Sequence, residues 1–377
     1  MTRQLATIQR IESIEPLAGY DRISKAQILG WEVTVINGEF QPGDFCVFAE
    51  PDSLFPRRPE FEFLAKYKWR IKARKVGPLI SQGIALPLDI LTKAEGVTRG
   101  WDGLWLWKSP TGLQGIPTLE GAEVTQMLGI IKHEIPEFDT GVTINGKKGK
   151  SRTAGNFPQW ISKTDETRIQ SVSSVLREAE GLTCYITTKC DGSSMTTYLK
   201  RNEETGEFTF AVCSRQQEKA KGEFCHFWYT AVKHGVEEKL RVFQAIHSVR
   251  FPEGIALQGE LCGPGVQKNR MKLGDYEFFI FNVYNIATKT FLDFADFVQI
   301  VDELGLKTAP ILNANFTIVA ETNVHTLMGI ANHRYATNPD SWAEGIVVRP
   351  LQELRHRKLG RWSFKLIGEN FMLQYGL

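Results

Sequence analysis

Residues 188–194 of the 377-residue chain read Thr188-Lys189-Cys190-Asp191-Gly192-Ser193-Ser194. The apolar run before it predicts a β-strand that ends at Lys189, and Gly192 predicts a turn that returns the chain beside the lysine. A lysine attacks phosphorus only as the neutral amine, and its ordinary pKa of about 10.4 leaves little amine near neutral pH. A nucleophilic Lys189 therefore requires positive neighbours or desolvation. Taken alone, the pattern favours the alternative of a solvated hairpin lysine.

Four segments further along combine a strand-like apolar run with a carboxylate, an aromatic ring or a lysine. They are 259–265 (GELCGPG), 277–283 (EFFIFNV), 344–349 (EGIVVR) and 363–366 (SFKL). Each supplies a group that a phosphorus-attacking amine needs near it. The ordered set therefore favours Lys189 as a nucleophile over a solvated lysine.

This set resembles the nucleotidyltransferase motifs of the covalent superfamily of ATP-dependent ligases and mRNA capping enzymes. In detail, KxDGSS, GELxGPGxQK (259–268) and SKTDETRIQ (162–170) are typical of nick-sealing RNA ligases. The resemblance covers residues 157–377 and implies three steps. A lysine attacks the α-phosphate of ATP, the AMP passes to a polynucleotide 5′-phosphate, and a 3′-hydroxyl then expels AMP. ATP and Mg²⁺ or Mn²⁺ are the cofactors that the resemblance implies.

The resemblance makes Lys189 the nucleophile and gives it cationic helpers. Arg168 and Lys365 are expected to bind the α-phosphate and to lower the pKa of Lys189, together with a metal ion. Many relatives carry two lysines in the last motif, whereas Ser363 occupies the first of these places here. Lys365 is therefore expected to fill that role alone.

Three carboxylates, Asp191, Glu260 and Glu344, lie at the ends of apolar segments. Buried carboxylates are costly unless they are paired or bind metal, and Mg²⁺ prefers oxygen ligands while retaining water. We expect the three to hold Mg²⁺ or Mn²⁺ largely through its hydration shell. Two alternatives remain open: Glu260 hydrogen-bonds the ribose, or a carboxylate forms a structural salt bridge with an arginine.

The resemblance also implies the nucleotide contacts. Phe281 is expected to stack on adenine, although the acidic residue that usually follows it is Asn282 here. Gln170 and the backbone around Thr188 are candidates for recognising the adenine edge. Arg215 resembles the residue that contacts the ribose or the incoming 5′-phosphate.

The N-terminal part has the pattern of a small β-barrel. Residues 26–36 are strand-like and end at the hairpin signal Asn37-Gly38, and about five short strands fit into 1–98. Such spacing is typical of an OB-type barrel, and 38–44 resembles the barrel turn of OB domains found on some RNA ligases. One face of it carries four cations that are candidates for phosphate contacts: Arg70, Lys72, Arg74 and Lys75.

We therefore expect an α+β protein with an N-terminal OB-like β-barrel, followed by a nucleotidyltransferase domain of antiparallel sheets with flanking helices. The predicted boundaries are 1–138 for the OB-like domain with an extension, 139–156 for a flexible basic linker, and 157–377 for the nucleotidyltransferase domain. Helices are expected at 218–242 and 293–304.

Composition narrows the class of protein. The net charge is only +2 and 42% of residues are hydrophobic, so any basic surface must be local. The six cysteines show no C-x-x-C spacing, which argues against structural zinc and indicates a reducing compartment. With neither a signal peptide nor a membrane-length apolar run, we expect a soluble, cytoplasmic protein without a membrane partner. No protein partner is indicated.

The position of the barrel separates three possible functions. DNA ligases and capping enzymes place an OB domain after the last motif, whereas only residues 366–377 follow Lys365 here. The expected reaction is therefore the joining of RNA 3′-OH and 5′-phosphate ends at nicks in duplex RNA or an RNA/DNA hybrid. The 2′-hydroxyl is the available handle for recognising RNA. A DNA ligase remains the alternative enzyme, and a nucleic-acid-binding module with a relict nucleotide pocket is the alternative of another class.

Overall fold

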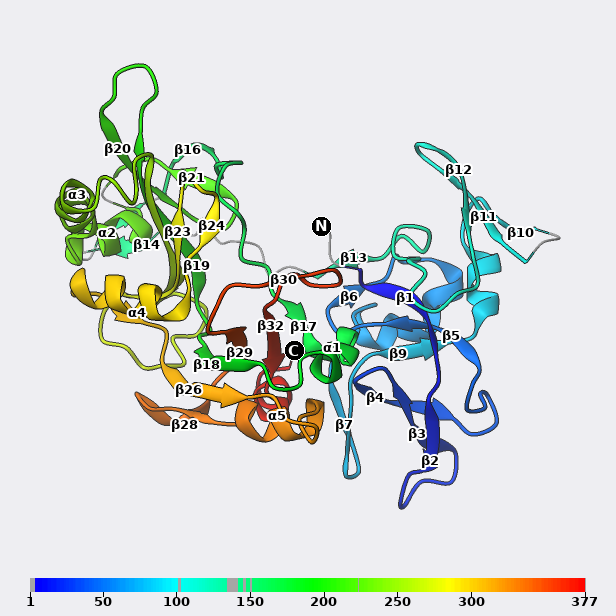
Figure 1. The fold of residues 1–377 in the computed structure, drawn as a ribbon. Helices are drawn as coiled ribbons and strands as arrows, with labels where there is room; N and C mark the ends of the chain where they lie inside the picture. Colours follow the sequence, from blue (N-terminus) through cyan, green and yellow to red (C-terminus); the bar gives the residue numbers. More distant parts are fainter. Residues whose placement is uncertain are drawn as a thin grey trace. The chain divides into compact units, whose positions relative to one another are not determined.

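The computed structural model describes residues 4–100, 103–133, 142–144, 147–149, 151–222 and 224–376. The chain forms two compact units (Figure 1). The first comprises Met1–Pro136, Ile169–Ser174 and Glu369–Leu377, and the second comprises Glu137–Arg168 and Val175–Gly368.

Short antiparallel strands make up most of the first unit. Alternating buried side chains of two three-stranded sheets, β2-β3-β4 and β1-β5-β9, meet in a core that includes Trp31, Val33 and Phe48. The strands are β1 (Ala6–Arg10), β2 (Ser13–Pro16), β3 (Ile23–Ile28), β4 (Trp31–Ile36), β5 (Phe45–Ala49), β6 (Ser53–Leu54), β7 (Arg74–Val76), β8 (Leu79–Ser81), β9 (Ile84–Leu86), β10 (Val97–Arg99), β11 (Trp105–Ser109), β12 (Gly112–Ile116) and β13 (Ile131–Lys132).

The prediction of one strand over 26–36 was wrong in detail. Leu29 adopts a left-handed φ of 53°, and the chain reverses there, so that β3 and β4 pair as a hairpin. The turn consists of Leu29 and Gly30; Gly30 is a turn signal, but the strand-like residues on both sides of it made the pattern look continuous. The helical segments of this unit are short: η1 (Pro59–Tyr67), η2 (Leu88–Lys93), η3 (Ile169–Val172) and α6 (Glu369–Tyr375).

A large sheet dominates the second unit, in the order β16-β21-β20-β19-β22-β23-β24, with β25 parallel to β23. Its strands are β16 (Thr153–Asn156), β19 (Ser193–Arg201), β20 (Phe208–Cys213), β21 (Gln217–Lys219), β22 (Gly254–Cys262), β23 (Glu277–Asn285), β24 (Thr290–Phe291) and β25 (Lys307–Thr308). Helices α2 (His226–Lys233), α3 (Val236–Ile246) and α4 (Phe294–Glu303) cover one face, where Trp228, Leu240 and Phe297 are buried (Figure 1).

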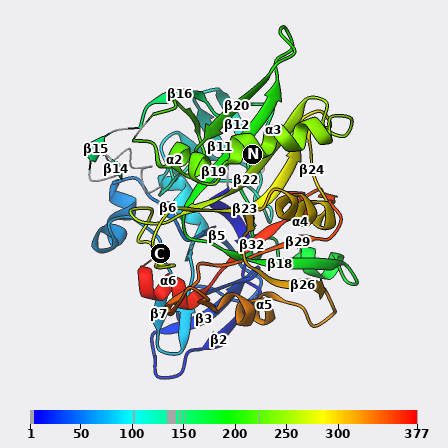
Figure 2. The same ribbon diagram turned by 90° about the vertical axis from the view of Figure 1, so that its left-hand side faces the viewer.

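Lys189 belongs to a five-stranded sheet. The strand order of this sheet is β17-β32-β29-β18-β26. Its strands are β17 (Thr167–Arg168), β18 (Thr183–Lys189), β26 (Ile311–Thr317), β29 (Gly345–Pro350) and β32 (Phe364–Ile367). The remaining elements are α1 (Ser174–Glu178), α5 (Val324–Ala331) and three hairpins: β14 (Val142–Ile144) with β15 (Lys147–Gly149), β27 (Arg334–Tyr335) with β28 (Asn338–Trp342), and β30 (Arg355–His356) with β31 (Gly360–Arg361). Helix α5 packs against β29 and β32, near β26 in the turned view (Figure 2).

The two helix predictions had different outcomes. The helix expected at 293–304 is present as α4. The helix expected at 218–242 begins instead with strand β21 and then breaks at Gly235, whose φ of +60° ends α2 and starts α3. Of the predicted linker, 139–141, 145–146 and 150 lie outside the described residues, whereas β16 joins the large sheet through β21.

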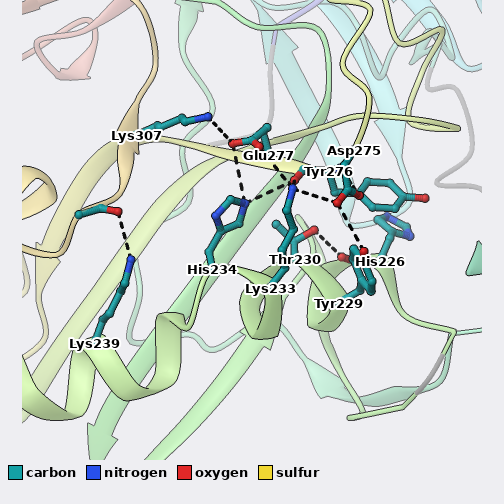
Figure 3. A network of polar contacts seen from close by, with 11 residues as sticks. His226, Tyr229, Thr230, Lys233, His234, Lys239, Asp275, Tyr276, Glu277 and Lys307 are labelled. Carbon is teal, nitrogen blue, oxygen red and sulfur yellow. Dashed lines mark hydrogen bonds and ion pairs between the residues drawn. The ribbon is translucent and has the colours of Figure 1, made fainter.

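A polar network fastens α2 to the first residues of β23 (Figure 3). The Lys233 ammonium donates to the Tyr276 carbonyl at 2.7 Å and pairs with Asp275 at 3.0 Å. Glu277, at the start of β23, pairs with Lys307 at 2.9 Å. Because β23 also carries Phe281, the network fixes one end of a strand that the sequence assigns to the nucleotide site.

Two expectations from composition concern the whole described chain. All six cysteines are buried free thiols, as expected for small apolar packing groups. Among the described residues, no helix is long and apolar enough to cross a membrane.

Candidate active site

Strand pairing brings the predicted cations to one face of the five-stranded sheet. Lys189 ends β18, and Thr187 in the same strand lies opposite Val347 of β29. Val347 in turn lies opposite Lys365 of β32, and Lys365 opposite Arg168 of β17. Paired residues, and residues two apart along a strand, share a face. Lys189, Lys365 and Arg168 therefore project from the same face.

Two glycines allow the close contacts around Lys189. Gly345 has a φ of +151°, and a Cβ there would collide with the Leu366 carbonyl. A Cβ on Gly192 would collide with the Leu261 carbonyl and lie 2.7 Å from the Cys262 sulfur. The loop after Lys189 therefore lies directly against β22, which brings the two sheets together at the lysine.

The charged partner of Lys189 is Glu344, with 2.6 Å between Nζ and Oε2. Burial alone would lower the pKa of Lys189, but the Glu344 and Glu260 carboxylates outweigh burial and raise this pKa above its ordinary value. The lowering that we expect from Arg168, Lys365 and a metal ion stays a prediction; the protein side chains alone surround the amine with carboxylates that keep it charged. Formation of the neutral amine therefore requires added positive charge that neutralises these carboxylates.

Glu260, near the end of β22, is the second carboxylate beside Lys189. Burial is the main cause that raises the pKa of Glu260 to about 7; Glu344 adds to this, and Lys189 opposes it. Two buried carboxylates have only one ammonium beside them to balance their charge. A divalent cation with oxygen ligands supplies the missing positive charge. The pair thus fits Mg²⁺ or Mn²⁺ held mainly through water. In the described part of the chain, no three His, Cys, Asp or Glu side chains gather as a metal site.

Asp191 matches the alternative of a structural salt bridge with an arginine, which the sequence left open. It forms a salt bridge with Arg270, and each side chain is 13% exposed. The loop that carries Arg270 also contacts the turn after the lysine, because the Gln267 amide donates to the Gly192 carbonyl at 3.2 Å. We therefore restrict the candidate metal ligands to Glu260 and Glu344. Sequence reasoning missed Arg270, whose one signal is its place just after the GELxGPGxQK motif.

The Thr188 side chain points to the histidine His333. Its hydroxyl lies 3.1 Å from His333 Nε2, and its backbone N–H donates to the Pro310 carbonyl at 2.8 Å. Burial lowers the pKa of His333, and its Nδ1 lies 3.1 Å from the Ile330 carbonyl. A neutral imidazole ring that donates through its Nδ1–H accepts a hydrogen bond from the Thr188 hydroxyl at Nε2. Because its N–H is already bonded, the backbone of Thr188 offers a nucleotide only its carbonyl.

Phe281 lies in a β-bulge. The pairing of β22 and β23 shifts there, so that Ile280 and Asn282 have partners and Phe281 has none. The ring is partly buried, and the Arg349 guanidinium lies 5.5 Å from its centroid. A bulge re-aims one side chain of a strand, and here it singles out the predicted adenine-stacking ring.

Asn282, the departure from the family pattern, has a structural role. Its amide nitrogen donates to Gln258 Oε1 at 3.3 Å, and its oxygen accepts from Arg361 at 2.9 Å. Gln258 donates in turn to the Ser162 carbonyl at 2.8 Å. The amide thus links β22, β23 and β31 through two hydrogen bonds, one of which comes from the charged Arg361 guanidinium.

Arg349 and Glu166 form a buried ion pair beside a cavity. Arg349 is 2% exposed, and 2.8 Å separates its Nη2 from Glu166 Oε1. The cavity of about 350 Å³ is lined by 162–166, 289–291 and residues from Glu353 to Ser363. Burial raises the pKa of Glu166, but Arg349 and Arg361 outweigh it and hold this pKa below its ordinary value.

Replacement of Glu166 by glutamine is expected to destabilise the protein in a pH-dependent way. Removal of one partner leaves Arg349 buried without its countercharge, which costs about 3 kcal/mol at neutral pH. A carboxylate with a depressed folded-state pKa stabilises above its unfolded pKa, and this stabilisation is lost as pH falls through the folded pKa. The difference in the free energy of unfolding between wild type and Glu166→Gln, measured with urea, should therefore become smaller in acid. Glu178→Gln at an exposed ion pair is the control, and a gap independent of pH would contradict the assignment.

Two other predicted residues, Arg215 and Gln170, have partners of their own. Arg215 pairs with the exposed Asp165 at 2.7 Å and lowers the pKa of Glu260, so it is within electrostatic reach of that carboxyl. Gln170 belongs to the first unit, where it is 1% exposed and its carbonyl accepts the Gly30 N–H at 2.8 Å.

Three of the four cations predicted on the OB-like face, Arg70, Lys72 and Arg74, have partners within the first unit. Arg70 pairs with Asp52 at 3.1 Å, and Lys72 donates to the Gly376 carbonyl at 2.5 Å. The Arg74 guanidinium lies 3.1 Å from the centroid of the Tyr67 ring.

The chain is similar to two family models and to a set of solved structures. Residues 182–367 match a family model described as RNA ligase, and residues 5–88 match one described as an OB-fold domain. A mutant of Naegleria gruberi RNA ligase without ligand aligns with a TM-score of 0.78 at 26% identity over 98% of each chain. Mutants of that enzyme with AMP and Mn and with ATP and Mn align at 26% identity over 98% of each chain, with TM-scores of 0.78 and 0.77. No curated protein sequence matches the chain.

Proposed function

The chain belongs to the RNA ligase family and is an ATP-dependent RNA ligase with an N-terminal OB-fold domain, and from this premise we propose that it seals nicks through a covalent lysyl–AMP. The observation that carries the proposal is the convergence of Lys189, Glu344 and Glu260 at the meeting of the two sheets. A phosphorus-attacking amine needs this combination of nucleophile, acid-base partner and candidate metal ligands.

Three balanced steps follow for Lys189. Its neutral amine attacks the α-phosphorus of ATP, so that an N–P bond forms and pyrophosphate leaves. An oxygen of the RNA 5′-phosphate then attacks the same phosphorus, and the lysine leaves as the amine. Finally the RNA 3′-hydroxyl attacks the activated 5′-phosphate, a phosphodiester forms, and AMP departs.

The candidate site residues have proposed parts in those steps. Arg168 and Lys365 bind the α-phosphate, because they lie side by side on the face from which Lys189 projects. Phe281 stacks on the base. Glu344 takes the proton that Lys189 loses, since the two groups are already 2.6 Å apart.

ATP and a divalent cation are the cofactors. The similarity to a ligase solved with ATP and Mn supports both. We propose that Glu260 and Glu344 hold the cation, and that when bound it neutralises their charge and stabilises charge on the α-phosphate. Without that neutralisation the two carboxylates keep Lys189 protonated.

The proposed substrate is a nick in duplex RNA or an RNA/DNA hybrid, with RNA at the 3′-OH end. The OB-fold domain supports this, because such domains bind nucleic acid along a groove. We propose residues 1–138 as the RNA-binding domain, 139–156 as the connector and 157–377 as the nucleotidyltransferase domain. Arg215 is the proposed contact to the incoming 5′-phosphate.

A comparison of nicks tests this specificity. A nick with a ribonucleotide at the 3′-OH should be sealed at least about tenfold faster than an all-DNA nick, because a lost hydrogen bond to the 2′-hydroxyl costs about 1.4 kcal/mol. The measurement is the single-turnover sealing rate with pre-adenylylated nicks that differ only in the last 3′ nucleotide. Equal rates would favour the DNA ligase alternative.

A further inference from the structure

The hairpin β27–β28 contributes a buried hydroxyl to the active site. Tyr335 is 2% exposed, and its hydroxyl oxygen accepts two backbone N–H groups. One comes from Asp191 at 3.1 Å and the other from Glu344 at 3.2 Å. One oxygen atom thus joins the loop after the nucleophile to the residue that pairs with it.

The two N–H groups lie where the β-ladder stops. The pairing of β18 with β29 ends at Lys189 and Gly345. Asp191 lies beyond that last pair on one strand, and Glu344 lies just before it on the other. Among the residues that the structure describes, no ladder pair follows Lys189 and Gly345, so the Tyr335 hydroxyl replaces the ladder at the point where the lysine and its carboxylate must keep their separation.

The same hairpin holds a third segment of the site. The Asn338 side chain donates to the Arg270 carbonyl at 2.7 Å, and Arg270 forms the salt bridge with Asp191. The Tyr335 ring packs in a cluster with Cys190 and Cys262, which flank the nucleophile and the end of β22. These contacts keep the ring from moving away from the two amides.

We propose that Tyr335 is a positioning residue for lysine adenylylation, whose hydroxyl sets the separation of Lys189 and Glu344 by holding the Asp191 and Glu344 amides. The inference rests on the proposed function, because it assigns Tyr335 a part in the first of its steps. The hydroxyl acts through the backbone and does not itself contact ATP. Its loss therefore alters the attack geometry and leaves nucleotide binding in place.

Tyr335→Phe tests the inference because it keeps the ring and removes the hydroxyl. We expect the rate of lysyl–AMP formation at saturating ATP to fall by about 100-fold, since a displacement near 1 Å at a reacting group costs about that much. The KM for ATP should stay within about threefold, because uniform binding is untouched. The matched control is Tyr198→Phe, which removes another buried hydroxyl whose bond to Glu218 is 2.7 Å long.

Amide hydrogen exchange gives the second readout. In the wild type, the Asp191 and Glu344 amides should exchange as slowly as those of the neighbouring strands, and in Tyr335→Phe they should exchange faster. An unchanged adenylylation rate in Tyr335→Phe, or fast exchange of both amides in the wild type, overturns the inference. The exchange measurement on the wild type tests the inference even if Tyr335→Phe does not fold. If the wild type forms no lysyl–AMP, the proposed function fails, and exchange still tests the contact separately.

Discussion

Lys189→Ala acquires no covalent AMP when it is incubated with α-labelled ATP and Mg²⁺, whereas the wild-type protein is labelled. We expect a loss of at least about 10⁴-fold, because removal of a nucleophile eliminates the covalent step itself. Lys189→Arg should be equally inactive, since a guanidinium stays charged and cannot attack phosphorus. Both variants keep the apolar strand that precedes the lysine, so a folded, unlabelled protein is the expected product. The measurement is retention of label on the denatured protein.

The control for this experiment is Lys200→Ala, which removes a lysine from β19 that pairs only loosely with Glu203 at 3.5 Å. It should label like the wild type. Label that persists in Lys189→Ala would place the nucleophile elsewhere. A wild-type protein that takes up no label would favour the binding module with a relict nucleotide pocket.

Glu344→Gln should reduce the rate of lysyl–AMP formation by at least about 100-fold, and two opposing effects make this result informative. Loss of the carboxylate lowers the pKa of Lys189, because Glu344 is a main cause of its elevation. More amine is then present, which by itself would speed attack. Loss of a proposed metal ligand removes several kcal/mol of transition-state stabilisation, and this is the larger effect.

A pH–rate profile separates the two effects. In Glu344→Gln the plateau should be lower and the acid limb should move to lower pH, because the lysine now loses its proton more easily. Mg²⁺ or Mn²⁺ titration should show a weaker dependence on the metal. Glu303→Gln, at a surface pair with His247, is the matched control. A variant that labels faster than the wild type would mean that Glu344 only restrains the lysine.

The sequence predicted the fold class and the order of the domains because both depend on local patterns. Strand alternation, the Gly192 turn and the ordered motifs all lie within short windows. The matches to an OB-fold domain and to an RNA ligase confirm the predicted α+β architecture with the barrel first. Boundaries were less accurate where a single glycine interrupts a strand-like run, as at Leu29-Gly30.

Much of the candidate site depends on partners that are distant along the chain. Tyr335 and Arg270 contact the nucleophile loop from positions 144 and 79 residues away from Asp191. A single sequence carries no signal for such pairs, because many tyrosines and arginines stand in similar local contexts. Two carboxylates that are distant along the chain, Glu260 and Glu344, likewise raise the pKa of Lys189 because the fold brings them beside the amine.

The ion pair between Lys189 and Glu344 also bears on how the enzyme survives between turnovers. A free neutral lysine in a pocket reacts with any small acylating or carbonyl compound in the cell, whereas an ammonium does not. Because the carboxylates raise the pKa of Lys189, the resting side chain is protected from such modification. On the mechanism that we propose, Lys189 becomes reactive only when the nucleotide and its cation bind together. The two carboxylates would then protect the proposed nucleophile from the wrong electrophile as well as serve the reaction.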